Sequence, residues 1–360
     1  PYAEPEELVE VYLTQEVFPY SPLSYPDYLD VREATREIFS DVGVGGFTFG
    51  QVDQGDRVGS LLGELVSGTY VPTLGLGAAV GRTLLPEDDV SPGAHFVAML
   101  SHGYWQREYA GDPGVVGRDI RLNGYTFTIV GVASQDYPGT IAGVPADFIV
   151  PINMVQKLQQ GTGNPLEARD NQSWFMKGRL RPGATLEGAQ VTLSGVAADL
   201  RATYPGTWDE TRGFLAIPTE DVVMNPAFDR YLVLASVLAL VLVGVVLLIA
   251  CANLASFLLA RGTDRKKEVA MRLALGAHRG TLIRQLLTET TLLAFLGGIL
   301  GMGVSVWLLS LLTRMELPLP GGLSLDLAMT GKAFLFGLGV TVLTGLLFGL
   351  APALQSTNPD

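Results

Sequence analysis

The chain has 360 residues, 48% of them hydrophobic and 17% charged, and its 36 acidic against 24 basic residues give a net charge of −12. The acidity argues against nucleic acid as a partner, because phosphate backbones are bound by basic surfaces. A single cysteine, Cys251, excludes both an intramolecular disulfide and a thiolate metal site within one chain, and we expect it to be a small buried hydrophobe.

The charge is unevenly distributed along the chain. Residues 1–230 hold 15 Lys and Arg against 30 Asp and Glu, a net charge of −15, whereas residues 231–360 hold 9 against 6, a net charge of +3. A segment of about 230 residues is long enough to bury a full core or two smaller ones. We therefore expect an acidic soluble domain over residues 1–230, followed by a mildly basic domain over residues 231–360.

The first domain has the alternation and turn signals of a mixed α+β fold. Strands are expected over residues 8–13, 47–52, 57–66, 96–100, 120–122, 125–132, 173–180 and 213–217, and helices over 24–38 and 186–204. Ser24 is a candidate N-cap with Pro26 in the first turn, and Asn123-Gly124 predicts a two-residue hairpin turn. The element order predicts two βαβ-like halves that flank a β-rich insertion.

Few side chains of this domain suggest chemistry. His95 and His102 lie near Ser101 and Asp88-Asp89, but no third ligand at metal spacing and no G-x-S-x-G motif accompanies them. The acidic run 87–89 is typical of a solvated turn or a helix cap. We therefore expect no catalytic, cofactor-binding or metal-binding residue in this chain, and we do not expect an enzyme.

Three long uncharged segments follow, over residues 231–260, 290–313 and 333–351. A helix needs about 20 apolar residues to cross the hydrocarbon core of a bilayer. Buried helices of a soluble core are the alternative, but such helices are usually shorter and carry polar residues at a period of 3.6. The segments predict three transmembrane helices. Their lack of ionisable residues argues against a proton-coupled carrier.

The loops between these segments predict the orientation. Residues 261–289 carry seven basic and three acidic side chains, whereas residues 314–332 have no net charge. The positive-inside rule places loop 261–289 in the cytoplasm and residues 1–230 outside. Because the sequence opens at Pro1 without Met or signal peptide, we expect that an upstream transmembrane helix has been cut away, and that the C-terminus is a cut as well.

Two polar or small-residue patterns occur in this membrane part. Glycines at G-x-x-x-G spacing, a pattern of close helix packing, are Gly297, Gly301, Gly345 and Gly349, and Gly337 extends the second set through Thr341. Glycine is also simply common in membrane helices. Residues 266–277 read as a short amphipathic helix ended by Gly276, with Glu268 and Arg272 as an i,i+4 pair. Such a helix can rest on lipid or dock into a partner's groove.

The segment 265–277, followed by 282–289, resembles the coupling segment of FtsX/MacB-type ABC transporter permeases. Residues of the first domain resemble the MacB periplasmic core domain. The matching segments are 25–28, 66–70, 74–75, 81–82, 100–105, 111–113, 116–118 and 122–132. The pattern is similar to that of large orphan permeases that carry this unit twice, a resemblance that would make the chain one half of such a protein.

The resemblance implies four helices per unit, so that the first helix is missing here. It implies a multi-pass protein of the bacterial inner membrane, whose cytoplasmic partner subunit binds the ATP, and type VII-like mechanotransmission to a periplasmic domain acting on export substrates. The implied coupling residues are Lys267, Glu268, Met271, Arg272, Leu275 and Gly276. A second permease unit, as homodimer or internal repeat, and a periplasmic partner protein are further implied partners.

An alternative function stays open at this point. The chain could be an ATP-independent, membrane-anchored scaffold or receptor that binds a protein or peptide through residues 1–230. Association of loop 261–289 with a nucleotide-binding subunit would distinguish the two hypotheses. The sequence does not name the substrate.

Overall fold

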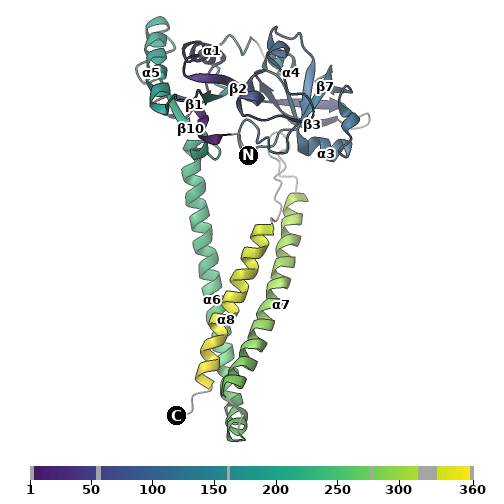
Figure 1. Cartoon of the computed structure of the whole chain (residues 1–360), viewed down its shortest axis with the longest axis vertical. Helices are drawn as coiled ribbons and strands as arrows, with labels where there is room; N and C mark the ends of the chain where they lie inside the picture. Colours follow the sequence, from purple (N-terminus) through teal and green to yellow (C-terminus); the bar gives the residue numbers. More distant parts are fainter. Residues whose placement is uncertain (1–3, 54–57, 160–162, 276–278, 315–330, 357–360) are drawn as a thin grey trace. The chain divides into compact units, whose positions relative to one another are not determined.

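The computed structural model describes residues 4–53, 58–159, 163–275, 279–314 and 331–356 (Figure 1). These residues form two compact units, and the boundary between them falls after Leu232. The first unit is built on a sheet and the second on long helices. Each unit is described by itself below.

The first unit contains one mixed sheet. Its strands are β1 (Leu8–Thr14), β2 (Phe39–Asp53), β3 (Val58–Val66), β4 (Ala78–Gly81), β5 (Val97–Leu100), β6 (Asp119–Leu122), β7 (Tyr125–Ala133), β8 (Phe148–Pro151), β9 (Phe175–Leu180) and β10 (Gly213–Pro218). Their order in the sheet is β10-β1-β9-β2-β3-β8-β5-β7-β4, and β6 pairs with β7 and, at one position, with β2.

Short and long helices lie between these strands. The α-helices are α1 (Tyr25–Ala34), α2 (Tyr70–Thr73), α3 (His102–Tyr109), α4 (Val155–Leu158) and α5 (Leu186–Thr203), and the 3₁₀ turns are η1 (Pro5–Glu7), η2 (Pro86–Asp89), η3 (Pro113–Val115), η4 (Ile152–Met154) and η5 (Thr219–Asp221). The predicted cap is confirmed, because Ser24 Oγ accepts a hydrogen bond from Asp27 N at 3.1 Å. The helix ends at Ala34 rather than Ile38, since Phe39 already begins β2.

The two predicted β-α-β segments share one sheet instead of forming separate halves. Strand β9 lies between β1 and β2, and β1 lies between β9 and β10. Each of these neighbouring pairs is antiparallel. Helices α1 and α5, which belong to different segments, therefore contact each other beside the same strands (Figure 1). The strands of the insertion, from β3 onward, extend the sheet beyond β2.

The hairpin predicted at Asn123-Gly124 is present, and the predicted strands 47–52 and 57–66 also pair with each other. Strands β2 and β3 pair antiparallel from Asp53 opposite Val58 to Gly45 opposite Val66. Asn123 and Gly124 connect β6 to β7 with φ angles of 53° and 84°. Positive φ at both central residues is the requirement of a type I′ turn, which asparagine and glycine meet at little cost. The four-residue strands β4 and β8 were not predicted.

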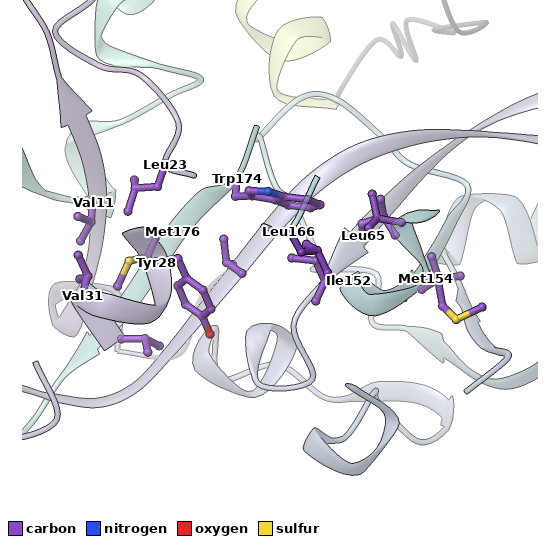
Figure 2. Close-up of a cluster of buried hydrophobic side chains, with 14 of the residues drawn as sticks. Val11, Leu23, Tyr28, Val31, Leu65, Ile152, Met154, Leu166, Trp174 and Met176 are labelled. Carbon is purple, nitrogen blue, oxygen red and sulfur yellow. The ribbon is translucent and has the colours of Figure 1, made fainter. Parts of the chain in front are cut away.

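The core of the first unit is continuous across the sheet. Figure 2 shows Val11 and Tyr28 at one end of the cluster and Leu65 and Met154 at the other, with Trp174 between them. Each of these five side chains is at most 1% exposed. Complete burial of a side chain of this size contributes roughly 1.5–3 kcal/mol. This cluster, the larger of two in the first unit, therefore joins β1 and α1 to β3 and η4.

The second unit holds most of helix α6 (Pro226–Ala274) and all of α7 (Arg279–Arg314) and α8 (Gly331–Ser356). Segments Pro226–Asn253 and Thr291–Leu311 are long and apolar enough to cross a membrane. The described apolar part of α8, Gly331–Thr344, is shorter, and the side chains after it lie outside the description. The prediction that Cys251 is buried is confirmed by its exposure of 3%.

Helix α6 differs from the prediction in one respect that bears on function. A separate helix was expected over residues 266–277, but α6 continues without a break from Pro226 to Ala274. Residues 261–274 are rich in Arg, Lys, Ala and Leu, which favour helix, and the single Gly262 is tolerated inside a long helix. The predicted loop over 261–289 is therefore largely the end of α6 and the start of α7.

Candidate functional site

The predicted coupling residues lie at the C-terminal end of α6. Lys267, Glu268, Met271 and Arg272 belong to its last turns, and Leu275 follows its last residue. The side chains of Lys267, Glu268 and Arg272 lie outside the described residues, as does Gly276 entirely.

Two described side chains of this segment are apolar and open to solvent. Met271 is 61% exposed and Leu275 is 84% exposed. Leu275 N donates to Met271 O at 3.1 Å, so the two residues lie one helical turn apart on the same face. Exposed apolar anchors at this spacing, within a basic segment, are the pattern by which a helix docks into a groove of a partner protein.

The helices α7 and α8 lie side by side in the second unit (Figure 1). The close approach occurs at Gly298, where a Cβ atom would lie 2.7 Å from Thr341 Cγ2. A glycine at such a point has no side chain and so lets two membrane helices pack closely. Any larger residue at position 298 would push the two helices apart.

The predicted packing glycines lie away from this contact. A Cβ added at Gly297, Gly301 or Gly337 would meet no atom within 4 Å among the described residues, and the surroundings of Gly345 and Gly349 lie outside the description. Among the described glycines of α7 and α8, the one that meets the neighbouring helix is Gly298, opposite Thr341. One residue along a helix rotates a side chain by about 100°, so adjacent glycines cannot be told apart by spacing alone.

The first unit contains a buried ion pair between helix α1 and the segment before β9. Asp27 is fully buried, and its Oδ1 accepts hydrogen bonds from Arg169 Nη1 at 2.6 Å and from Trp208 Nε1 at 3.3 Å. Arg169 also pairs with Asp30 at 2.7 Å, and its guanidinium carbon lies 4.1 Å from the centre of the Tyr204 ring. Burial raises the pKa of the Asp27 carboxyl, and the bonds from Ser24 and Arg169 oppose this rise.

A second group of buried charges lies on β1, β9 and β3. Lys177 pairs with Glu10, whose other oxygen accepts from Tyr12 Oη at 2.5 Å. Glu64 is fully buried, and its carboxyl accepts from Tyr137 Oη at 2.6 Å and from the backbone N of residue 140 at 2.5 Å. Burial raises the pKa of Glu64. These contacts hold loop 134–146 onto the sheet.

Of the two alternatives predicted for the acidic run, the helix cap is present at Asp88, which is only 7% exposed and accepts a hydrogen bond from the backbone N of Leu85 at the start of η2. Its carboxyl accepts from Arg82 at 2.6 and 3.0 Å and from Leu85 N at 2.9 Å. Burial raises the pKa of Asp88, but the bonds from Arg82 and Leu85 outweigh it and leave the pKa below its ordinary value. The neighbouring Asp89 carboxyl accepts from Asn153 N at 3.2 Å. Burial, opposed only in part by hydrogen bonds from Asn153 and Gly68, raises its pKa to about 6.

These two adjacent carboxyls predict opposite effects of amide substitution. Below pH 4 the contribution of Asp89 to stability is fully present, and it is lost as the pH rises through about 6, since the folded state binds its proton more tightly. Asp89→Asn should therefore raise the free energy of unfolding at pH 7.5 by about 1–2 kcal/mol, with little change near pH 4.

Asp88→Asn should act the other way. The stability that Asp88 contributes is present above its unfolded pKa and is lost as the pH falls, so the variant should be destabilised at pH 7.5 by about 1 kcal/mol. Thermal unfolding of the full chain between pH 4.5 and 7.5, followed by tryptophan fluorescence, measures both effects. Shifts of the same sign at pH 7.5 would contradict the assignment.

The histidines considered in the sequence have local structural contacts. Ser101 caps α3 by accepting from Tyr104 N at 3.2 Å, and the His102 ring lies 5.5 Å from the Trp105 ring. In the part of the chain that is described, no group of three His, Cys, Asp or Glu residues could hold a metal ion.

A hollow of about 630 Å³ lies beside α3 and β6. Its lining residues are Val52, Tyr104, Glu108, Tyr109, Asp119, Ile120, Arg121 and Thr126.

Comparisons with known proteins agree with this architecture. Residues 4–195 match the family model of a MacB-like periplasmic core domain, and residues 240–360 match that of an FtsX-like permease C-terminal region. The macrolide export ATP-binding/permease protein MacB of Syntrophobacter fumaroxidans is 37% identical over 98 residues, which are 27% of this chain and 13% of that protein. The MacB protein of Campylobacter jejuni is 22% identical over 287 residues, or 79% of this chain and 41% of that protein.

Among solved structures, the periplasmic region of MacB from Actinobacillus actinomycetemcomitans superposes with a TM-score of 0.43 and 12% identity, covering 60% of this chain and 90% of that one. The chain spans less than half the length of the two curated relatives described above. The core-domain model covers more than half of the chain, and the permease model covers most of the rest. The chain therefore belongs to the MacB/FtsX-type family of ABC transporter permeases.

Proposed function

We propose that this chain is the permease subunit of a type VII-like mechanotransmitting ABC transporter. Membership of the permease family implies association with an ABC ATPase subunit. In the proposed mechanism, ATP is bound and hydrolysed by that partner, and the end of α6 receives the motion in the cytoplasm. The first unit, on the outer side of the bacterial inner membrane, delivers the motion to export substrates.

The observation that carries the proposal is the length and continuity of α6, which has 49 residues. At 1.5 Å per residue the helix is about 74 Å long, whereas the hydrocarbon core of a bilayer is about 30 Å thick. Its membrane-crossing segment, Pro226–Asn253, is at the N-terminal end. The uncharged run of the sequence ends at Ala260, so residues 261–274 extend about 21 Å beyond it within the same helix.

In this proposal, α6 connects the two ends of the mechanism as one continuous helix. Its N-terminal turns belong to the first unit, directly after β10 and η5, and its C-terminal turns carry the coupling residues. In the proposed mechanism, a displacement at Met271 and Leu275 passes along the hydrogen-bonded backbone of one helix toward Pro226 rather than through a loop. The basic character of residues 261–289 supports a cytoplasmic position for this end.

The proposal is tested by reversing charge in the coupling segment. Arg272→Glu in the full-length protein, reconstituted with its ATP-binding subunit in lipid nanodiscs, should reduce stimulation of the ATPase about tenfold or more, because a single anchor of an interface often contributes 2 kcal/mol. Leu275→Asp should do the same. Lys332→Glu at the start of α8 is the matched control and should leave stimulation unchanged.

Wild-type stimulation in both coupling variants would overturn the assignment of these residues. Failure of the wild-type protein to bind any ABC ATP-binding subunit would instead favour the ATP-independent scaffold or receptor. Folding and insertion of each variant are verified by thermal unfolding and by the yield of reconstituted protein, so that loss of coupling is not confused with loss of structure.

The orientation is tested by cysteine labelling. Cys251→Ala removes the single cysteine, and Arg272→Cys is then introduced at the coupling end. We expect a membrane-impermeant maleimide to label this position only after the cells are opened. Arg36→Cys in the first unit, where the arginine side chain is 64% exposed, should be labelled in intact spheroplasts. Labelling of position 272 from the outside would contradict the proposed orientation and, with it, the proposed mechanism.

A further inference from the structure

The loop between β1 and α1 exposes two adjacent apolar side chains. Val17 is 76% exposed and Phe18 is 67% exposed. A single exposed apolar residue is ordinary on a soluble surface, but a large adjacent pair at the tip of an ordered loop is a candidate interaction surface. We call Val17 and Phe18 the loop tip.

The loop that carries the tip is held in place at its base. Leu13 and Ser21 exchange two backbone hydrogen bonds of 2.9 Å, and Ser21 Oγ donates to Phe18 O at 3.2 Å. The rings of Tyr12 and Tyr20 pack edge to face with their centres 5.9 Å apart. The loop tip is thus presented from a defined base.

The same loop is bonded to the start of helix α6. Asn225 is only 9% exposed; its Nδ2 donates to Tyr20 O at 3.0 Å, and its Oδ1 accepts from Ala227 N at 2.9 Å in the first turn of α6. The Asp229 carboxylate accepts from the backbone N atoms of residues 223–225 at 2.9, 2.9 and 3.3 Å. Loop and helix start are therefore bonded together within the first unit.

The position of this junction along α6 places it at the bilayer surface. The membrane-crossing segment begins at Pro226, and Arg230 is the last charged residue before the uncharged run. Its guanidinium carbon lies 5.9 Å from the centre of the Tyr231 ring, and basic and aromatic residues mark the membrane interface. Asn225 precedes Arg230 by five residues, about 8 Å along the helix. The headgroup layer on each side of a bilayer is about 5–8 Å thick.

We propose that the loop tip inserts into the headgroup layer of the bilayer on the side of the first unit. Val223 and Phe228, which are 62% and 65% exposed beside the same junction, contribute to the same contact. The occupant is lipid because the loop is bonded to the first turns of a membrane helix. Anionic headgroups are not the recognised feature, since Glu16 adjoins the tip and residues 1–230 carry a net charge of −15. The inference rests on α6 crossing a membrane and is independent of the ATPase partner.

Fluorescence quenching in nanodiscs of phosphatidylcholine tests the proposal. In the full chain with Cys251→Ala, an environment-sensitive fluorophore is attached at Phe18→Cys. The matched control is Val191→Cys on α5, because Val191 is also apolar and 73% exposed. Lipids spin-labelled near the glycerol backbone should quench position 18 several-fold more strongly than position 191, and aqueous iodide should do the reverse. Added salt should not change either result.

Equal access of iodide to both positions, without quenching by lipid, would overturn the proposal. Protection of position 18 from both quenchers would overturn it as well, since a second copy or another protein would then cover the tip. Neither result would affect stimulation of the ATPase, so failure here is distinct from failure of the proposed function.

A second variant tests whether the bond to α6 sets the depth of the tip. Asn225→Asp retains an acceptor for Ala227 N but removes the donor to Tyr20 O. It should reduce lipid quenching at position 18 several-fold, while quenching at Tyr231→Cys stays unchanged. Undiminished quenching at position 18 in this variant would show that the junction does not position the loop and would overturn that part of the proposal.

Discussion

Asp27→Ala should lower the free energy of unfolding of the first unit by about 3–5 kcal/mol, because removing one partner of a buried ion pair leaves the other charge without compensation. Arg169, whose side chain is only 16% exposed, would retain Asp30 as a carboxylate partner but lose Asp27. Trp208 Nε1 would lose its acceptor. The N-cap of α1 at Ser24 would remain, so the loss is assigned to the ion pair. Denaturant unfolding of the full chain, followed by tryptophan fluorescence, measures the effect.

The matched control is another carboxylate of the same helix. Glu33 pairs with Arg36 at the surface, where the two side chains are 65% and 64% exposed. Solvent-exposed pairs of this kind contribute about 0–1 kcal/mol, so Glu33→Ala should change stability little. Comparable losses in the two variants would show that burial does not strengthen the Asp27 pair. Such a result would contradict the conclusion that the buried ion pair of Asp27 and Arg169 holds α1 to the segment before β9.

Gly63→Ala should also destabilise the first unit, by about 1–3 kcal/mol, since it overpacks the core. A Cβ at position 63 would lie 2.1 Å from Phe148 Cζ and 2.2 Å from Cε2. The Phe148 ring is fully buried and also packs against Gly50 on the neighbouring strand, where an added Cβ would lie 2.8 Å from the ring. The ring therefore has little room to move away from position 63. The two glycines thus make room for one aromatic ring of β8.

Two further variants isolate this cause. Gly59→Ala lies on the same strand with no atom within 4 Å of the new Cβ, so it should be neutral or slightly stabilising. In a Phe148→Leu background, Gly63→Ala should cost clearly less than in the wild type, because the ring is gone. If the cost stays the same in both backgrounds, the glycine is required for a reason other than the ring.

Because α6 is continuous, the proposed coupling segment is the end of a long helix and not a separate helix. A separate amphipathic helix would lie along the membrane surface, whereas the observed helix end projects along the axis of the membrane-crossing segment. The exposed Met271 and Leu275 are then presented at the end of a rod rather than on a flat surface. In the proposed mechanism, a partner that docks at this end would act about 21 Å beyond Ala260, where the uncharged run ends.

Local signals in the sequence predicted local structure well. Ser24 with Pro26 located the start of α1, Asn123-Gly124 predicted a type I′ turn, and the uncharged run after Arg230 predicted the membrane-crossing part of α6. These features depend on residues only a few positions apart, whose conformational preferences act whatever the rest of the chain does. The matching segments of both domains also indicated the family correctly.

Local signals in the sequence could not predict which buried charged residues form ion pairs. Glu10 and Lys177 are 167 residues apart, and each interrupts an apolar strand, a signal that marks an unusual position but not its partner. Asp27 and Arg169 are likewise separated by 142 residues. Their pairing follows from the insertion of β9 between β1 and β2, which is decided by the packing of whole elements.

By itself the sequence determined the cap at Ser24, the turn at Asn123-Gly124 and the family. Only the tertiary structure decided which strands are neighbours, which of two adjacent glycines faces α8, and where α6 ends. The physical reason is that local preferences and hydropathy act over a few residues, whereas strand order and helix rotation depend on contacts between segments far apart in the chain. Those long-range contacts join Asn225 to Tyr20 across 205 residues and so place the loop tip at the start of the membrane helix.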